Sequence, residues 1–537
     1  MEITKLQNLA SNPKNSVWVS ANAGSGKTKI LIDRIIKLLL AGVAPSNILC
    51  VTYTKAAAAE MLMRLQKIIN KWAIIDEHKL CDELQQIYDA QIDNELMQKA
   101  RNLFFLLHDS LRGISILTIH SFCQDLLNNF PHEAGLNPSF QLISEEQGNE
   151  LRNIAKIATW RMAAENAQSE LALMLDYLLD NLGEHSLNQW LMQIDKMRTK
   201  LSKVLANQEL NNLAIENLYA ASQMQKDEEW QQILHKYFND DDNFRDILKN
   251  ISLILQQGSA KDKEKYQPIN DFLCAEQSPI ALHNFALSIL TNEGTQYKTL
   301  ATNGTLKKIP PQLFAQWQEI NKRAEKYFTD YHLLKSVKLS HALMLIGYHW
   351  NEQYQQIKQQ KSLVDYADLL EKAHELLQNP EVADWILYKL DGKIEHLLID
   401  EAQDTSGLQW QITQTLTAEL FAGEGAKGIQ SLFVVGDEKQ SIFGFQGADM
   451  QQFIKQADDY SLKASQIGTE MLKIPLNVSF RSVAIILEFV DKIFSDNELV
   501  QAVSNENQPL LHHSFRGKQR GLVRIYPIKS EDESDMQ

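Results

Sequence analysis

Ala21-Asn22-Ala23-Gly24-Ser25-Gly26-Lys27-Thr28 is a glycine-rich segment that joins two apolar stretches of different periodicity. The run Val17-Trp18-Val19 before it is short and continuous, which is typical of a buried strand. The order of strand, glycine-rich loop and helix predicts a loop that binds phosphate groups. The helix behind the loop is indicated by apolar residues at helical spacing, namely Ile30, Leu31, Ile35, Leu38 and Leu39.

The residue types in this loop suit phosphate chemistry. Glycines at 24 and 26 allow backbone N–H groups to converge on phosphate oxygens, and the helix N-terminus adds partial positive charge. We expect Lys27 to reach the β- and γ-phosphates, and Thr28 to give its hydroxyl to Mg²⁺. Ala21 stands where glycine is commonest, so an ordinary glycine-rich turn remains the alternative for this segment taken alone.

A second segment places paired acids at the end of an apolar run. His396-Leu397-Leu398-Ile399 predicts a buried strand, and Asp400-Glu401-Ala402-Gln403-Asp404 follows it directly. One carboxylate at such a strand end can hold Mg²⁺ through its waters, and the next can deprotonate the water that attacks a γ-phosphate. We therefore expect Asp400 to be the metal residue and Glu401 the general base. An isolated acidic pair would carry no functional meaning without the phosphate loop in the same chain.

Five segments, in chain order, resemble motifs of superfamily 1 helicases of the UvrD/Rep type. The acidic segment 400–404 is similar to the second motif of that family. Within the family, residues 18–24, Glu438-Lys439-Gln440 and Phe445-Gln446-Gly447 most resemble AddA, the helicase–nuclease subunit of bacterial double-strand break repair. The other four segments resemble motif Ia, the motif after it, motif III and motif IV, at residues 52–61, 118–122, 436–449 and 477–482.

The resemblance assigns roles that spacing alone does not. It implies that Gln440 senses the γ-phosphate, that Arg481 reaches that phosphate as an arginine finger, and that Phe480 stacks on adenine. Gln7 would be the glutamine that contacts adenine. The implied cofactors are ATP and Mg²⁺. The full set of expected ATP-binding residues is Ala21, Asn22, Ala23, Gly24, Ser25, Gly26, Lys27, Thr28, Gln7 and Phe480.

The expected DNA-binding side chains lie in the same motifs. The net charge of −15 argues against binding of nucleic acid over the whole surface, so binding requires a local groove. Aromatic side chains stack on single-stranded bases, with about 1–3 kcal/mol per base. Gln446 stands where many relatives carry arginine, so one charged contact is absent or replaced. The resemblance implies DNA contacts from Tyr53, His120, Phe443 and Phe445.

The distribution of apolar runs predicts an α/β fold with a parallel sheet and a large helical insertion. The family resemblance implies that the sheet belongs to a P-loop (RecA-like) motor domain and that the chain contains the start of a second, incomplete motor domain. Strands are predicted at residues 16–20, 48–53, 114–118, 395–399 and 431–435. By resemblance, residues 1–135 with 346–455 form domain 1A, residues 136–345 the insertion 1B, and residues 456–537 the beginning of domain 2A.

Composition excludes several other classes of protein. A chain of 537 residues with 44% hydrophobic content is long enough for more than one domain. No uninterrupted apolar run is long enough to span a bilayer, and the first residues lack the apolar core of a signal peptide. The four cysteines are too widely separated for a zinc site or a disulfide framework. We expect a soluble cytoplasmic protein with no membrane partner.

The sequence is compatible with two functions. The first is an ATP-dependent helicase or translocase on single- or double-stranded DNA, 3′→5′ by resemblance, in recombinational double-strand break repair. Nothing in residues 456–537 resembles motifs V and VI, so we expect a second polypeptide with the remaining motor and nuclease segments, and the resemblance adds an AddB-like partner. The alternative is a truncated ATP- and DNA-binding module with little or no hydrolysis, which needs that polypeptide for motifs V and VI. A metabolite kinase would explain the loop but not the other motifs.

Overall fold

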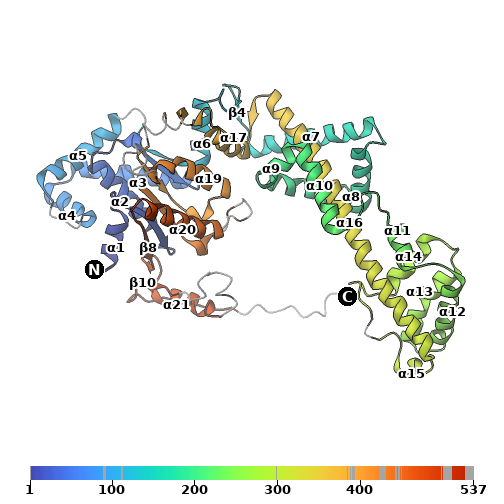
Figure 1. Ribbon diagram of the computed structural model, residues 1–537. Helices are drawn as coiled ribbons and strands as arrows, with labels where there is room; N and C mark the ends of the chain where they lie inside the picture. Colours follow the sequence, from blue (N-terminus) through green and yellow to red (C-terminus); the bar gives the residue numbers. More distant parts are fainter. Residues whose placement is uncertain are drawn as a thin grey trace. The chain divides into compact units, whose positions relative to one another are not determined.

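The fold comes from a computed structural model, which divides the chain into two compact units (Figure 1). The first unit contains Met1–Glu145 and Gln359–Gln537, and the second contains Glu146–Lys358. The structure describes residues 2–88, 92–109, 113–297, 299–383, 385–386, 389, 394–421, 431–441, 444, 448, 450–496, 499 and 511–526.

A six-stranded sheet organises the first unit, and every neighbouring pair of its strands is parallel. The unit is therefore α/β, as predicted. All five predicted strands are present, with ends within one residue of the expected ones. In spatial order the strands are β3 (Ser115–Thr118), β2 (Ile48–Thr52), β6 (His396–Ile399), β7 (Ser431–Gly436), β1 (Ser16–Ala21) and β8 (Met471–Leu476).

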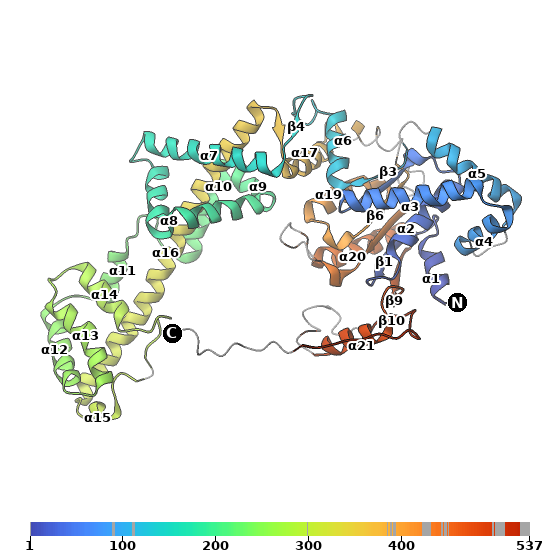
Figure 2. The ribbon, with the colours of Figure 1, turned by 180° about the vertical axis from the view of Figure 1, so that it is seen from behind.

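The sheet separates two hydrophobic cores because successive side chains of a strand point to opposite faces. In β1, Val17 and Val19 enter one core, and Trp18 enters the other. Trp18 stacks there on Trp410, with ring centroids 5.8 Å apart. The core of Val17 is covered by α1 (Glu2–Ala10), α2 (Lys27–Leu40), α3 (Lys55–Ile74), α4 (Glu77–Ile87) and α5 (Asn94–Asp109) (Figure 2). The core of Trp18 is covered by α6 (Ile119–Asn129), α17 (Tyr366–Gln378), α19 (Gly407–Leu416) and α20 (Met450–Gln466) (Figure 1).

Apolar patterning does not predict strand β8. It contains Pro475, which lacks a backbone donor and so argues against a place inside a sheet. The structure puts β8 at the sheet edge, paired with β1 from Ser16 to Ala21. Helix α20 and β8 thus complete the first sheet, whereas residues 456–537 are expected from the sequence to begin a second domain. The difference arises because the crossover through α20 returns the chain to the edge of the same sheet.

Arg34 of α2 attaches the N-terminal segment to the sheet. Its guanidinium is fully buried and donates hydrogen bonds to the backbone oxygens of Ala10, Asn12 and Asn15 at 3.2, 2.7 and 2.6 Å. A fourth bond, of 2.9 Å, reaches Ser431 Oγ on β7. Burial lowers the pKa of Arg34 to about 9. These bonds fix the end of α1, the helix that carries Gln7.

His396 at the start of β6 should make the first unit sensitive to acid. Its Nδ1 lies 2.7 Å from Ser431 Oγ, and its Nε2 has no hydrogen-bond partner among the described residues. Burial and then the Arg34 cation lower its pKa from 6.5 to about 4. Between those values the unfolded chain binds a proton that the folded chain does not, so stability is complete above pH 6.5 and falls as the pH drops towards 4.

We therefore expect His396→Asn, which removes the titrating group, to reduce the acid sensitivity of unfolding. In the wild type, the histidine should lower the free energy of unfolding by about 2 kcal/mol near pH 5 and by close to zero above neutrality. Urea unfolding of both proteins at the two pH values measures this difference. Equal losses of stability in variant and wild type would contradict the assignment to His396.

The second unit is helical in every element that the structure describes. Two short parallel strands, β4 (Gln141–Leu142) and β5 (Leu363–Val364), flank it along the chain. Asp365 then caps α17 through a capping box. The helices are α7 (Glu145–Glu165), α8 (Glu170–Lys196), α9 (Arg198–Ala206), α10 (Gln208–Ser222), α11 (Trp230–Tyr237), α12 (Asp242–Gln256), α13 (Ala260–Cys274), α14 (Pro279–Ser288), α15 (Asn303–Leu306) and α16 (Pro311–Gln360).

Helix α16, with 50 residues, holds the second unit together (Figure 1). Its first half packs in one core with α11 to α14. Its second half is hydrogen-bonded to the chain around α9 and α10, because Asn351 Nδ2 donates to Leu205 O at 3.1 Å and Asn211 Nδ2 donates to Met344 O at 3.3 Å. The helix continues past residue 345, the predicted end of the insertion, and runs through Gly347 to Gln360.

Asp262 of α13 is a buried carboxylate that five donors surround. Burial alone would raise its pKa, but the hydrogen bonds from Thr302 and Ser259 hold that pKa well below its usual range. Thr305 Oγ1 also donates to it, at 2.8 Å. We expect Asp262→Asn to destabilise the helical unit by about 2–4 kcal/mol, because an amide NH₂ would face donors. Thermal unfolding followed by circular dichroism tests this, and a loss below about 0.5 kcal/mol would contradict it.

Candidate nucleotide-binding site

The loop 22–26 joins the carboxyl end of β1 to the first turn of α2. Gly24 and Gly26 have φ values of 73° and 91°, in the left-handed region that favours glycine. A Cβ atom on Gly24 would lie 2.7 Å from the Cβ of Arg481, so this position has no room for a side chain. The carbonyl of Gly26 accepts the N–H of Ile30 at 3.1 Å. The loop therefore ends at a helix N-terminus, which is what phosphate binding requires.

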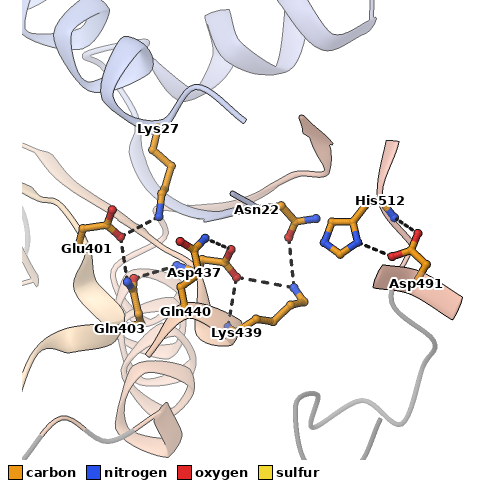
Figure 3. Close-up of polar contacts among 9 residues, drawn as sticks. All are labelled: Asn22, Lys27, Glu401, Gln403, Asp437, Lys439, Gln440, Asp491 and His512. Atoms are coloured by element: carbon orange, nitrogen blue, oxygen red, sulfur yellow. Dashed lines mark hydrogen bonds and ion pairs between the residues drawn. The ribbon is translucent and has the colours of Figure 1, made fainter. Parts of the chain in front are cut away.

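Lys27 and Glu401 meet across this site. Lys27 begins α2, and Glu401 follows β6 with a left-handed backbone, φ 49°. Lys27 Nζ lies 2.7 Å from Glu401 Oε2 (Figure 3). The lysine side chain is 11% exposed and the glutamate side chain 36%, so the pair is open to solvent on the glutamate side. A phosphate group that engaged Lys27 would have to replace Glu401 as its counter-ion.

Asp400 is the buried acid of the pair. It is 8% exposed, and its Oδ1 has no hydrogen-bond partner among the described residues. Burial, and then the charge of Glu401, raise its pKa to about 6, while Lys27 acts in the opposite direction. The raised pKa means that the groups around this carboxylate do not fully compensate its charge. Its free oxygen therefore fits the hard oxygen ligand that Mg²⁺ prefers.

One residue of the loop and one of α2 add to this fit. Ser25 Oγ is buried, and no described residue forms a hydrogen bond with it. Thr28 is half-buried in the first turn of α2, where the phosphate-loop motif predicts the metal-binding hydroxyl. In the described part of the chain, no three of the His, Cys, Asp and Glu side chains form a cluster that could hold a metal by itself.

The end of β7 lies next to the acidic segment and holds Gln440. Asp437 Oδ2 accepts a hydrogen bond from Gln440 Nε2 at 2.5 Å, and Asp437 O accepts one from Gln440 N at 2.9 Å (Figure 3). Asp437 itself is buried, at 4% exposed. The candidate phosphate sensor is thus anchored to a fixed carboxylate.

Two side chains that sequence reasoning leaves without a role also face this site. Lys439 Nζ donates to Asn22 Oδ1 in the phosphate loop at 3.2 Å and lies 3.9 Å from Asp437 Oδ1. Gln403 is buried and hydrogen-bonded to both Glu401 and the backbone of Asp437 (Figure 3). Both belong to segments that resemble family motifs, so only their place within a motif could have indicated them.

Three further candidates reach the loop from other segments. Phe480 N donates to Gly24 O at 2.8 Å, which brings Arg481 beside the loop. The Phe480 ring lies 4.9 Å from the ring of Phe515, centroid to centroid. Gln7 Nε2 lies 3.6 Å from the position a Cβ would take on Gly26. This region contains β9 (Val478–Ser479), β10 (His513–Ser514) and α21 (Ala484–Ile493).

The described candidates for DNA contact lie elsewhere on the sheet. Tyr53 follows β2, and His120 follows β3, two strands on the far side of β6 from the phosphate loop. Burial and then Asp404 raise the pKa of Tyr53 to about 12. Burial and then Lys55 lower the pKa of His120. Phe443 and Phe445, the other two candidates, lie outside the described residues, as does Gln446.

Comparison with known proteins gives an independent result. Residues 3–461 match the family described as UvrD/REP helicase N-terminal domain. Similar proteins, each named as a subunit of an ATP-dependent helicase/nuclease, occur in Lactobacillus helveticus (25% identical over 92% of this chain), Desulfitobacterium hafniense (26% over 91%) and Ligilactobacillus salivarius (23% over 97%). The chain spans 40%, 36% and 41% of those relatives. Among the described helices, none has both the length and the apolar character needed to cross a membrane.

Proposed function

The chain belongs to the UvrD/REP helicase family, and on that premise we propose that it is an ATP-dependent DNA helicase or translocase of recombinational double-strand break repair. The observation that carries the proposal is the convergence of Lys27, Glu401 and Gln440 at one end of a parallel sheet. These groups come from three separate segments of the chain. The similar proteins named as helicase/nuclease subunits support the assignment to DNA repair.

In this proposal the phosphate loop binds ATP. Backbone amides of residues 21–28 contact the phosphates, and Lys27 leaves Glu401 to pair with their negative charge. Gln7 and Phe480 contact adenine from either side of the loop, which agrees with their positions next to Gly26 and Gly24. Glu401 is the general base for the attacking water, and Gln440 senses the γ-phosphate. Arg481 stabilises the charge of the transition state.

Thr28 and Asp400 would hold Mg²⁺. The free Oδ1 of Asp400 and the position of Thr28 at the start of α2 support this pairing. When bound, the ion would neutralise charge on the β- and γ-phosphates. The role of Asp400 is to supply a fixed, buried oxygen, and that of Thr28 is to supply a hydroxyl from the first helical turn.

DNA would bind along the edge formed by the ends of β2 and β3. Tyr53 and His120 lie there, and Phe443 and Phe445 belong to the same group by resemblance. We propose movement on single-stranded DNA in the 3′→5′ direction, with entry from double-stranded DNA. We also propose a cytoplasmic location, an AddB-like partner, and a second polypeptide with the remaining motor and nuclease segments. These assignments rest on family resemblance and on the motifs.

The competing function is an ATP- and DNA-binding module with little hydrolysis. The ion pair between Lys27 and Glu401 is the observation in its favour, because it neutralises both groups in the structure. In that case motifs V and VI from a partner polypeptide would be needed before turnover.

Steady-state ATP hydrolysis by the purified chain, with and without single-stranded DNA, separates the two functions. The proposal predicts turnover that DNA stimulates and that Lys27→Ala abolishes. Nucleotide binding without turnover, in both the presence and the absence of DNA, would establish the binding module instead. The Lys27→Ala variant also controls for contaminating ATPases.

A further inference from the structure

Gln403 joins the two segments that the proposed hydrolysis requires. Its side chain is 2% exposed, so its amide has no access to bulk water. Gln403 Nε2 donates to Glu401 Oε2 at 2.9 Å and to Asp404 Oδ2 at 3.3 Å. Gln403 Oε1 accepts the backbone N–H of Asp437 at 2.9 Å. One buried amide therefore contacts both the candidate base after β6 and the start of the segment after β7.

We propose that Gln403 is a positioning residue that sets the orientation of Glu401 relative to Gln440. The inference rests on the proposed function of the site, since it concerns the same hydrolysis. It adds a residue to which neither the motifs nor the relatives assign a role.

The first step of the argument concerns Glu401 when phosphate is present. In the structure its Oε2 accepts from two donors, Lys27 Nζ at 2.7 Å and Gln403 Nε2 at 2.9 Å. Phosphate binding takes Lys27 away, and Gln403 is then the remaining donor of the two. The Glu401 side chain is 36% exposed, so without that donor it would sample several rotamers. Gln403 keeps the carboxylate in one direction when the base is needed.

The second step concerns Gln440. Asp437 presents its backbone N–H to Gln403 and its Oδ2 to Gln440 Nε2, at 2.9 and 2.5 Å. A path of three hydrogen bonds therefore runs from Glu401 through Gln403 and Asp437 to Gln440 (Figure 3). One end of the Gln403 amide contacts the base, and the other end contacts Asp437, the residue that holds the phosphate sensor.

Close packing at Gly436 shows that this amide is fixed. A Cβ on Gly436 would lie 2.8 Å from Gln403 Oε1 and 2.9 Å from Phe453 Cε2, so only glycine leaves room for the contact. Ser441 Oγ also donates to the backbone oxygen of Gln403, at 3.2 Å. Gln403 is thus held by a hydrogen bond to its backbone oxygen, by the hydrogen bonds of its amide, and by close packing against Gly436.

The test compares Gln403→Met with Gln409→Met. Methionine keeps the length of the side chain and removes both hydrogen-bonding ends. Gln409 is a matched control, because it is also buried, at 6% exposed, and its Oε1 accepts the backbone N–H of Ser406 at 3.0 Å without contact to the site. Thermal unfolding, measured before the kinetics, shows whether each variant is folded.

We expect Gln403→Met to lower kcat for ATP hydrolysis by about 10- to 100-fold, the effect of a misoriented catalytic group. KM for ATP should change by less than about threefold, since ground-state binding does not use this amide. Gln409→Met should keep both constants within about twofold of wild type. The second readout needs no turnover: Gln403→Met should weaken binding of ADP with aluminium fluoride, which imitates the transition state, and leave binding of ATPγS unchanged.

A third variant, Gln403→Glu, separates positioning of the base from a merely structural link. It keeps an acceptor for Asp437 N and loses the donor to Glu401, so it should lose kcat as Gln403→Met does. Wild-type kcat in Gln403→Met, or full recovery in Gln403→Glu, would overturn the inference. A wild-type chain that binds ATP and does not hydrolyse it contradicts the proposed function instead. In that event the comparison of ADP with aluminium fluoride against ATPγS still decides the role of Gln403.

Discussion

Replacement of Arg481 with alanine is expected to lower kcat for ATP hydrolysis by about 10³- to 10⁵-fold, the range for loss of an arginine finger. The side chain is exposed, and in the described part of the chain its guanidinium forms neither an ion pair nor a hydrogen bond. Its Cβ lies against the backbone of Gly24, so the guanidinium can reach a γ-phosphate in the loop. Nucleotide affinity should change much less, because the charge that Arg481 stabilises develops in the transition state.

Two variants make this expectation specific. Arg481→Lys keeps the positive charge and loses the planar fork of donors, so most of the loss should remain. Arg516→Ala removes another exposed arginine of the same region, two residues after β10, and should leave kcat within about twofold of wild type. If kcat of Arg481→Ala remained within about tenfold of wild type, the arginine finger would have to come from another segment.

The central strands of the sheet could be predicted from the sequence because they are buried on both faces. Such strands are mostly continuous apolar runs, and every residue of β6 and β7 is buried. A polar motif follows each of these apolar runs, so the carboxyl end of each strand could also be predicted. The acidic pair and the phosphate loop therefore had to meet, since carboxyl ends of parallel strands share one edge.

The remaining features depend on contacts that local patterns do not encode. β8 contains a proline, which a central strand excludes and an edge strand tolerates, so only the sheet order reveals it. The contact of Phe480 with Phe515 joins residues on either side of α21, and nothing in the sequence near Phe515 indicates it. The contacts of Gln403 are likewise not predicted by local sequence patterns. Its burial and its bond to Asp437 arise only when β6 and β7 pair.

Replacement of Glu401 with glutamine should separate binding from hydrolysis. We expect kcat to fall by about 10²- to 10⁴-fold, because the amide cannot accept the proton of the attacking water. Nucleotide affinity should rise by about two- to fivefold, since Lys27 would no longer have to break a partly exposed ion pair of 2.7 Å. Titration with a fluorescent ATP analogue and single-turnover kinetics measure the two effects separately.

The ion pair between Lys27 and Glu401 predicts opposite effects of this substitution on nucleotide affinity and on turnover. The same Glu401 oxygen that holds Lys27 in the structure is the one that Gln403 contacts, so the carboxylate competes with phosphate before binding and acts as base after it. Lys27→Ala provides the contrast, because it should weaken both binding and turnover. If Glu401→Gln also weakened nucleotide binding, the ion pair would be organising the loop for phosphate and not competing with it.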